Sequence, residues 1–255
     1  MPTIDYAVYR ASESEQLRTA SLLKMLPSGL TTVLEIGARD GHFSRLLTGY
    51  FKNVTALDLV KPPFEGDRIT TVAGDVTHLE FADSSFDCVF CTEVLEHVRE
   101  LEKAVREIVR VAKSHIVIGV PFRQDLNCGR LTCINCKTIN PGWGHVNSFD
   151  RERLLQLFEG FEVHAEELVW HNDEWTNPLS TWLMDFGGNP WGPYSDENCC
   201  GSCGNPLIEP PPRNLAQKLA CKSAYVLNAI QRVFYRPRPF WIHLAFRNKT
   251  RPNGA

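Results

Sequence analysis

The chain has 255 residues, of which 43% are hydrophobic and 22% charged, with a formal net charge of −3 at pH 7. This composition excludes a disordered or fibrous chain and is typical of one large domain, or of one domain with a sizeable insertion. The first residues lack the basic and then apolar pattern of a secretion signal. No stretch has the roughly 18 uncharged apolar residues that cross a bilayer, so we expect a cytoplasmic protein without a transmembrane segment.

Strand-like and helical patterns alternate along the first half of the chain. A leading helix is predicted over Glu13–Met25, and apolar, β-branched runs predict strands over 31–37, 53–60, 68–75, 86–92 and 114–122. Helical spacing marks 42–51 and 96–113 between them. Strands that are apolar on both faces and alternate with helices indicate a parallel sheet covered on both sides, so we expect a doubly wound α/β fold.

The second half of the chain is less regular. We expect a helix over Asp150–Phe158, a strand over Phe161–Val169, a turn-rich stretch over 171–212 and a closing strand over 239–248. Between the last two, apolar residues at helical spacing predict a helix whose apolar face packs in the core: Leu215, Leu219, Val226, Ile230 and Val233.

The C-terminal segment is basic. From Pro210 to Ala255 the chain has nine Lys or Arg, Arg251 among them, and no acid, which leaves 18 basic and 30 acidic residues in the first 209. Such asymmetry is typical of contact with nucleic acid, anionic lipid or a phosphorylated substrate. A basic tail that lies on the acidic body is an equal alternative.

A glycine-containing turn and three acids follow the first three predicted strands. Glu35 ends the first strand, and Gly37 and Gly41 bracket the turn into the next helix, where the missing Cβ lets a ligand lie against the backbone. Asp58 ends the second strand, where a carboxylate can accept both hydroxyls of a ribose. Asp75 closes the third strand and can reach an adenine amino group.

In this order, over residues 30–122, these motifs resemble the class I S-adenosylmethionine-dependent methyltransferases. The resemblance implies a Rossmann-like, mostly parallel sheet with an antiparallel last strand, and S-adenosyl-L-methionine as the cofactor. It assigns the methionine part of the cofactor to the glycine turn, the ribose to the acid after the second strand, and the adenine to the acid after the third, flanked by two apolar residues. The cofactor-binding residues are then Glu35, Gly37, Gly41, Asp58, Leu59, Asp75 and Val76.

One residue departs from the family pattern. Arg39 stands at the middle of the turn, where the family usually has glycine, so we expect its side chain to point away from the cofactor. A nicotinamide-binding domain is the competing interpretation, but it would need a glycine near position 39 to admit a pyrophosphate. Arg39 therefore favours the methyltransferase.

The fourth predicted strand leads into the segment TEVLEHV, which resembles the same segment in small-molecule methyltransferases, including those that act on quinone precursors. Glu93, His97 and His145 are the catalytic candidates, and either imidazole can serve as general base near neutral pH. The metal-binding set of small-RNA 2′-O-methyltransferases and of some ubiquinone-pathway O-methyltransferases resembles a group of residues here. The group consists of Glu93, Glu96, His97 and a later histidine, for which His145 is the candidate. A divalent ion there would lower the pKa of an acceptor hydroxyl. The alternative is that no ion binds and that Glu96 and His97 start a helix.

Nine cysteines without a secretion signal argue for free thiols or metal ligands. Two Cys-x-x-Cys pairs lie in polar, turn-rich sequence, as in a split zinc ribbon, and predict one structural zinc: Cys133, Cys136, Cys200 and Cys203. Cys128, Cys199 or His145 could replace one ligand. Cys128 and the first pair also match the spacing of plant-type [2Fe–2S] ferredoxins, although nothing else in the sequence suggests that fold.

The remaining cysteines are predicted to be core residues. Cys88 and Cys91 lie in a predicted strand, where an odd separation points their side chains to opposite faces, and Cys221 lies in a predicted helix. The zinc would tie the loop after the fifth strand to the turn-rich stretch and build a lid over the acceptor site. Tryptophans of these loops either stack on a ligand or fill a small core.

We therefore expect a methyltransferase core over residues 1–126, a cysteine loop over 127–147, a core helix and strand over 148–170, a Trp- and Cys-rich lid over 171–212, and a basic helix with the closing strand of the core over 213–255. The favoured function is methyl transfer to a small-molecule or glycan acceptor, at a hydroxyl of a sugar, glycolipid or other metabolite. The alternatives are an RNA methyltransferase that uses the basic C-terminal segment and a zinc-containing binding module without turnover. Peripheral membrane contact and the oligomeric state are left open.

Overall fold

The computed structural model describes residues 6–249 and divides them into two compact units. The core unit comprises residues 11–122, 149–170 and 239–249, and the accessory unit comprises 6–10, 123–148 and 171–238. Arg251 of the basic C-terminal segment lies outside the described residues. None of the helices between residues 6 and 249 combines the length and the hydropathy that crossing a bilayer requires.

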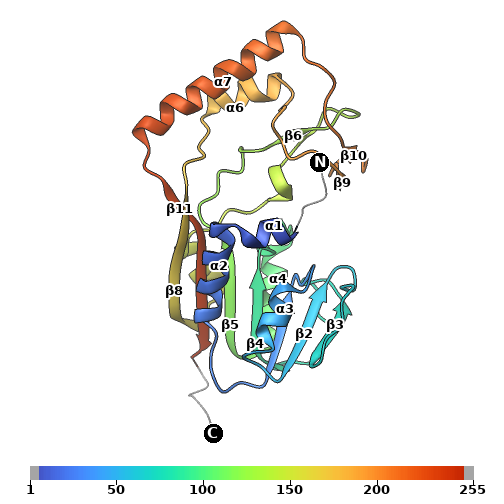
Figure 1. Ribbon diagram of the computed structural model, residues 1–255, viewed down its shortest axis with the longest axis vertical. Helices are drawn as coiled ribbons and strands as arrows, with labels where there is room; N and C mark the ends of the chain where they lie inside the picture. Colours follow the sequence, from blue (N-terminus) through green and yellow to red (C-terminus); the bar gives the residue numbers. More distant parts are fainter. Residues whose placement is uncertain (1–5, 250–255) are drawn as a thin grey trace. The chain divides into compact units, whose positions relative to one another are not determined.

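Among the residues described, the core unit is built on a seven-stranded sheet in the order β3-β2-β1-β4-β5-β11-β8 (Figure 1). Strands β1 to β5 run parallel, and β11 pairs antiparallel with β5. The predicted doubly wound, Rossmann-like sheet with an antiparallel last strand is therefore confirmed. The strands are β1 (Thr32–Ile36), β2 (Asn53–Asp58), β3 (Ile69–Ala73), β4 (Phe86–Thr92), β5 (Ala112–Pro121), β8 (Phe161–Asn172) and β11 (Arg238–Asn248).

Burial on both faces of the sheet explains why the strands are apolar runs. In β4, Cys88 and Phe90 pack into one core cluster, whereas Val89 and Cys91 pack into the cluster on the other face. Successive side chains of a strand alternate between faces, so both clusters draw on the same short segment. The prediction that Cys88 and Cys91 are core residues on opposite faces is confirmed, and burial raises the pKa of both thiols.

Helices flank the strands in chain order. Leading helix α2 begins and ends within one residue of its predicted bounds, but α4 begins later than predicted. Glu96 and His97 belong to the short 3-10 helix η1 (Leu95–His97), and the extended backbone of Val98 separates them from α4. The α-helices from residue 6 to 157 are α1 (Tyr6–Ala11), α2 (Glu13–Lys24), α3 (His42–Leu47), α4 (Leu101–Val111) and α5 (Arg151–Leu157).

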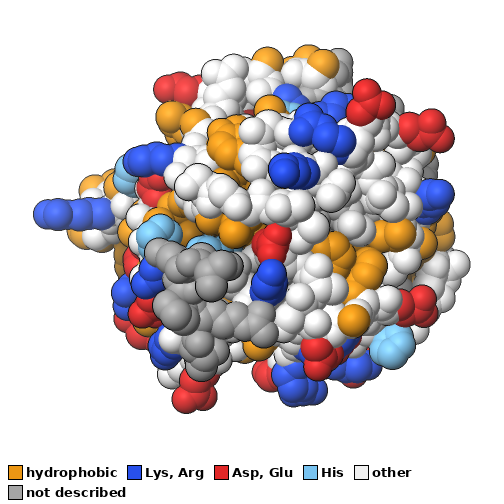
Figure 2. Space-filling model, turned by 90° about the horizontal axis from the view of Figure 1, so that it is seen from below, with side chains coloured by type: hydrophobic (Ala, Val, Ile, Leu, Met, Phe, Trp, Pro, Cys, Tyr) orange, Lys and Arg blue, Asp and Glu red, His pale blue; other side chains and the backbone are white. Residues whose placement is uncertain are grey.

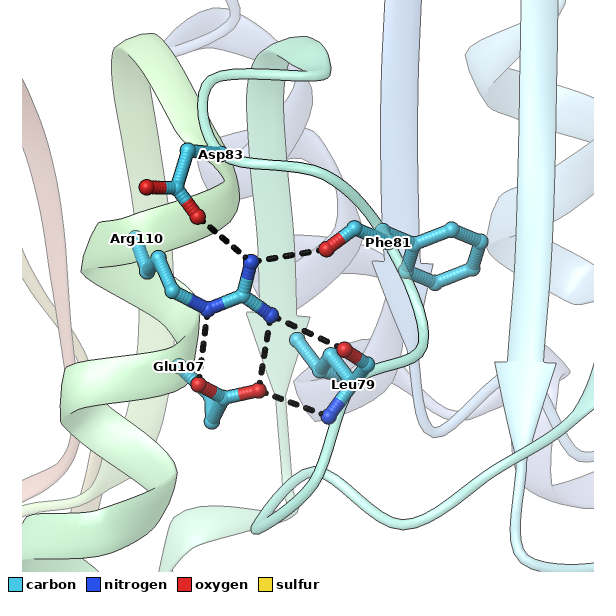
Figure 3. A network of polar contacts seen from close by, with 5 residues as sticks. All are labelled: Leu79, Phe81, Asp83, Glu107 and Arg110. Carbon is cyan, nitrogen blue, oxygen red and sulfur yellow. Dashed lines mark hydrogen bonds and ion pairs between the residues drawn. The ribbon is translucent and has the colours of Figure 1, made fainter.

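A guanidinium on α4 holds the loop between β3 and β4 (Figure 3). Arg110 donates to the carbonyl oxygens of Leu79 and Phe81 at 2.8 and 2.7 Å and to the carboxylate of Asp83 at 2.8 Å. It also donates two bonds to Glu107, whose carboxylate accepts the Leu79 N–H. The bond from Arg110 lowers the pKa of Glu107 to about 2. The segment that follows β3 is thereby fixed to α4.

A buried polar cluster joins α2 to β8 and β11. Arg18 forms a 2.7 Å ion pair with Glu15, and both side chains are almost fully buried. Ser21 donates to Glu167 at 2.9 Å, so its oxygen accepts a 2.7 Å bond from Nδ1–H of His243. Burial, and then the charge of Arg18, lower the pKa of His243 to about 3, which keeps this imidazole neutral at pH 7.

The accessory unit contains two short hairpins and a helix pair. The hairpins are β6 (Leu131–Thr132) with β7 (Ile139–Asn140), and β9 (Ser195–Cys199) with β10 (Pro206–Leu207). The short 3-10 helix η2 (Gly142–Gly144) follows the first hairpin. Helix α6 (Pro178–Phe186), which lies in the stretch predicted to be turns, packs against α7 (Leu215–Phe234).

Helix α7 is present as predicted, but the prediction that its apolar face packs in the core is wrong. Leu215 and Val233 at its two ends are exposed, as are the apolar residues between them on that face. The buried residues are the smaller Ala220, Cys221 and Ala224, and Cys221 packs on Gly187 at the end of α6. Helix α7 belongs to the accessory unit and β11 almost entirely to the core unit, so the structure divides the segment 213–255 that we expected to act as one.

Candidate functional site

The carboxyl ends of β1, β2, β3 and β4 lie along one edge of the sheet. Ile36 of β1 is in register with Leu57 of β2 and Cys91 of β4, and Asp58 is in register with Ala73 of β3. Residues directly after parallel strands meet at such an edge, where α/β proteins bind their ligands. The structure therefore brings together the predicted residues Glu35, Gly37, Asp58, Asp75 and Glu93.

The turn from β1 into α3 requires glycine at two positions. Gly37 has a φ of +85°, and a Cβ there would lie 2.4 Å from Cγ2 of Val94, which follows β4. Gly41 has a φ of +74°, and a Cβ there would lie 2.7 Å from the ring of Phe64. The N–H of Gly37 also donates to the carbonyl of Leu57 at 2.8 Å. The turn is thus packed closely against the ends of β2 and β4.

Asp58 is tied to this turn through the backbone. Its Oδ2 accepts the N–H of Arg39 at 2.9 Å, and its Oδ1 accepts the N–H of Leu59 at 2.7 Å. Each carboxylate oxygen has a second acceptor site, so Asp58 keeps the capacity to receive two hydroxyls. The side chain of Arg39 is exposed, and its φ of +39° turns its N–H toward Asp58. Arg39 therefore takes part in the turn through its main chain.

The other predicted cofactor-binding residues differ in exposure. Glu35 is buried and accepts a hydrogen bond from the hydroxyl of Ser44 on α3. Asp75 is exposed, and its Oδ1 accepts the N–H of Thr77 at 2.8 Å. The two apolar residues expected to flank an adenine ring are unlike each other. Leu59 is 72% exposed, whereas Val76 belongs to the core.

Two acids and a histidine follow β4. Glu93 has a φ of +56°, and its N–H donates to the carbonyl of Gly119 on β5 at 2.9 Å. Glu96 is fully buried, and burial followed by the charge of Glu93 raises its pKa well above the ordinary range. His97 is exposed at the end of η1.

The third catalytic candidate belongs to the other unit. His145 follows η2 in the accessory unit, and its Nδ1 lies 2.6 Å from Oε1 of Gln124. The candidates therefore come from separate units, with Glu93 and His97 in the core unit and His145 in the accessory unit.

The four predicted metal ligands form one cluster in the accessory unit. The Sγ atoms of Cys133 and Cys203 are 3.6 Å apart, as are those of Cys136 and Cys200, and all four lie within 4.8 Å of one another. Thiolates bound to one tetrahedral zinc at about 2.3 Å are separated by about 3.8 Å. A disulfide would need about 2.05 Å. The spacing therefore fits four ligands of a single ion.

Asn140 supports this cluster and was not recognised in the sequence. Its Nδ2 donates to Sγ of Cys200 at 3.5 Å, and its Oδ1 accepts the N–H of Gly201 at 2.9 Å. Asn140 lies in the first hairpin and Cys200 in the second, so this side chain links the two. The N–H groups of Cys203 and then Ser202 lower the pKa of Cys200 to about 6, which favours the thiolate that binds metal.

The alternative ligands lie outside the cluster. Within residues 6–249, Cys128 and Cys199 do not join the four thiols. Burial, and then the charge of Asp125, raise the pKa of Cys128 to about 12, and Cys199 is exposed. Cys128 is therefore not in the group of thiols that contains Cys133 and Cys136, with which it would share an iron–sulfur cluster.

Comparison with known proteins places this geometry in context. Residues 34–118 match the family described as "Methyltransferase domain". The demethylmenaquinone methyltransferase of Renibacterium salmoninarum is 38% identical over 184 residues, which cover 66% of this chain and 70% of that protein. The sterol 24-C-methyltransferase of Yarrowia lipolytica is 30% identical over 133 residues, or 45% of this chain and 32% of that protein. This chain therefore spans about a third of the length of that relative.

A solved structure of similar fold comes from Burkholderia thailandensis. It is 1,6-didemethyltoxoflavin-N1-methyltransferase, with bound 1,6-didemethyltoxoflavin and S-adenosylhomocysteine. It superposes with a TM-score of 0.54 at 15% identity, over 95% of this chain and 81% of that chain. At this identity the likeness concerns the fold.

Proposed function

Because this chain belongs to the S-adenosylmethionine-dependent methyltransferase family, we propose that it transfers a methyl group from S-adenosyl-L-methionine to a small acceptor. The acceptor group is a hydroxyl of a sugar, glycolipid or other metabolite. The observation that carries the proposal is the position of Asp58, which is hydrogen-bonded to the Gly37–Gly41 turn at the carboxyl edge of the sheet. This is where α/β folds of this class bind nucleotides.

The residues at this edge fit the cofactor. Asp58 retains acceptor sites for two ribose hydroxyls, and the exposed carboxylate of Asp75 would accept a hydrogen bond from an adenine amino group. Gly37 and Gly41 allow the tight turn beside the proposed place of the methionine part, and Glu35 supports the turn through Ser44 on α3. The bound cofactor supplies an electrophilic methyl group on its sulfonium. Positioning of the acceptor oxygen in line with that group then provides much of the rate.

Glu93 and His97 are the proposed partners of the acceptor. Glu93 is half-buried directly after β4, and His97 is exposed three residues after Val94. A proton from the acceptor hydroxyl passes to His97 or Glu93, because Glu96 is fully buried and burial disfavours its charged form. His145 and a divalent ion at Glu93, Glu96 and His97 are alternatives. Two measurements of the pH–rate profile distinguish them. If His145 accepts the proton, His145→Asn should remove one step from the profile. If a divalent ion binds, addition of Mn²⁺ should add one.

The names of the relatives above favour a small acceptor over RNA, since they refer to a demethylmenaquinone and a sterol. Over the face drawn in Figure 2, Lys and Arg side chains are interspersed with Asp and Glu, so that face is not the surface of one sign that a nucleic-acid site needs.

We also propose a structural zinc in the accessory unit, held by Cys133, Cys136, Cys200 and Cys203. Such an ion would join the hairpin β6–β7 to the hairpin β9–β10. The apolar core that these two hairpins share contains few side chains. A unit with so little buried apolar surface gains much of its stability from a metal.

The test of the function has two steps. Calorimetry with S-adenosylhomocysteine measures cofactor binding, and methyl-labelled S-adenosylmethionine incubated with an extract of the source cells shows which fraction receives the label. Label in small molecules or lipid supports the proposal. Label in RNA would replace it with the RNA methyltransferase, and binding without any label transfer would favour a binding module.

A further inference from the structure

The outer face of α7 carries an apolar stripe that nothing in the described chain covers. Five of its residues fall within about 60° of the helix circumference, because each residue advances by 100°. Their side chains are 46% to 81% exposed, and the buried residues of α7 lie on the opposite side. The stripe consists of Leu215, Leu219, Val226, Ile230 and Val233.

Helix α6, which packs against the buried face of α7, carries a separate row of exposed apolar side chains. Leu179, Trp182 and Phe186 recur at positions i, i+3 and i+7, and are 52% to 61% exposed. The rings of Trp182 and Phe186 stack with their centroids 6.2 Å apart. An exposed apolar stripe such as that of α7 is uncommon on a soluble monomer and marks a contact site.

A cationic pocket opens beside the first half of the stripe. It has a volume of about 350 Å³, which suits a headgroup rather than a large ligand. Arg213, Lys218 and Lys222 line it together with Trp191 and Tyr225, whose rings meet edge to face at 6.1 Å. No Asp or Glu is among the described residues that line the pocket with these three cations. The pocket therefore suits a phosphate with an apolar neighbour.

We propose that the outer face of α7 docks on an anionic phospholipid membrane, with its stripe at the interface and a lipid phosphate in the pocket of Arg213, Lys218 and Lys222. An amphipathic helix with Lys beside a stripe of Leu, Ile and Val is the arrangement that lies in the plane of such an interface. On α7, Lys218 and Lys222 project from the edge of the stripe. Apolar burial and attraction to the headgroups then act on the same face.

The charges argue against other occupants. A second copy of this chain that laid its own α7 on the stripe would bring no acid to Lys218 and Lys222, because α7 contains none. RNA would use the cations but leave the aliphatic stripe in water. A membrane with anionic lipids satisfies both the cations and the stripe.

The experiment is co-sedimentation of the full chain with vesicles of phosphatidylcholine alone or mixed with phosphatidylglycerol. We expect binding to the anionic vesicles, and weaker binding as NaCl is raised. The double variant Lys218→Ala and Lys222→Ala should lower the partition coefficient about 30-fold. Leu219→Ser with Ile230→Ser should lower it at all salt concentrations, because the apolar burial is lost.

The matched control changes two exposed lysines of the core unit, Lys52→Ala and Lys103→Ala, and should alter partition less than about twofold. Circular dichroism verifies that each variant is folded. Failure of the folded wild type to bind anionic vesicles at low salt would overturn the proposal. So would equal binding to neutral vesicles, equal loss in the control, a stable dimer that does not bind vesicles, or binding to polyuridylate that needs Lys218 but not Leu219.

Discussion

The backbone N–H of Arg39 donates a 2.9 Å hydrogen bond to Oδ2 of Asp58, and so joins the turn after β1 to the end of β2. The bond uses one acceptor site of the carboxylate and fixes its orientation. It also explains how an arginine is accommodated in the turn, since only its main chain is required there.

Replacing Asp58 by alanine should weaken binding of S-adenosylhomocysteine by roughly 1.5–3 kcal/mol, or about 10- to 150-fold in Kd, because the bonds to the ribose are lost. Calorimetry on both proteins measures this. Asp67→Ala removes an exposed acid after β2 and should leave the Kd unchanged within about twofold. An unaltered Kd for Asp58→Ala would mean that the ribose lies elsewhere.

Arg110→Ala should lower the free energy of unfolding by about 1–3 kcal/mol, because two carbonyls and two carboxylates lose their donor (Figure 3). Arg110→Lys should recover less than half of the loss, since an ammonium cannot reproduce the planar fork. Arg106→Ala on the exposed side of α4 is the control, with an effect within about 0.5 kcal/mol. Urea unfolding gives the three values, and equal effects at positions 106 and 110 would refute the role of the network.

Cys200→Ser should reduce bound zinc from one ion per chain to less than about half, with a lower Tm, because one of four thiolates is lost. Cys199→Ser changes the adjacent residue, which lies outside the cluster, and should keep both zinc and Tm. Elemental analysis after reconstitution with Zn²⁺ measures the content. The same zinc content in both variants would refute the assignment of ligands.

The stability of the core unit should fall as the pH falls from about 6.5 to about 3, because His243 is neutral in the fold and gains a proton on unfolding. Because the pKa of His243 is lower in the folded than in the unfolded state, its full contribution to stability is present above the unfolded pKa. That contribution is lost as the pH falls toward the folded pKa. The slope due to this group is at most about 1.4 kcal/mol per pH unit. Urea unfolding at pH 7.5 and 5.0 should give a smaller difference for His243→Asn than for the wild type. His171→Asn, at an exposed position, should retain the wild-type difference, and an identical difference in all three would contradict the prediction.

The sequence predicted those parts of the site that depend on local pattern. Asp58 and Asp75 stand directly after apolar runs, so the order of strands and acids is readable without a structure. The link from Asn140 to Cys200 joins residues 60 positions apart, and neither hydropathy nor periodicity marks it. Contacts of this kind depend on how two hairpins meet, which local sequence does not specify.

The helices likewise differ in how much of their structure the local sequence reveals. Helix α6 has a local signal, because Asn177 caps its first turn and Pro178 stands at its first position, but it is short and surrounded by glycine and proline. Helix α7 was predicted from its apolar spacing, yet that spacing says only that a stripe exists. What covers the stripe, in this chain or outside it, depends on tertiary structure.

The position of β11 has a consequence for synthesis on the ribosome. This strand is the last of the described strands but lies inside the sheet, between β5 and β8. Until residues 238–248 emerge, the nascent chain has a β5 whose hydrogen-bonding edge is unpaired, next to the apolar residues of β4. An unpaired strand edge is a template for aggregation, so the interval before the final strand arrives is when this protein most needs a chaperone.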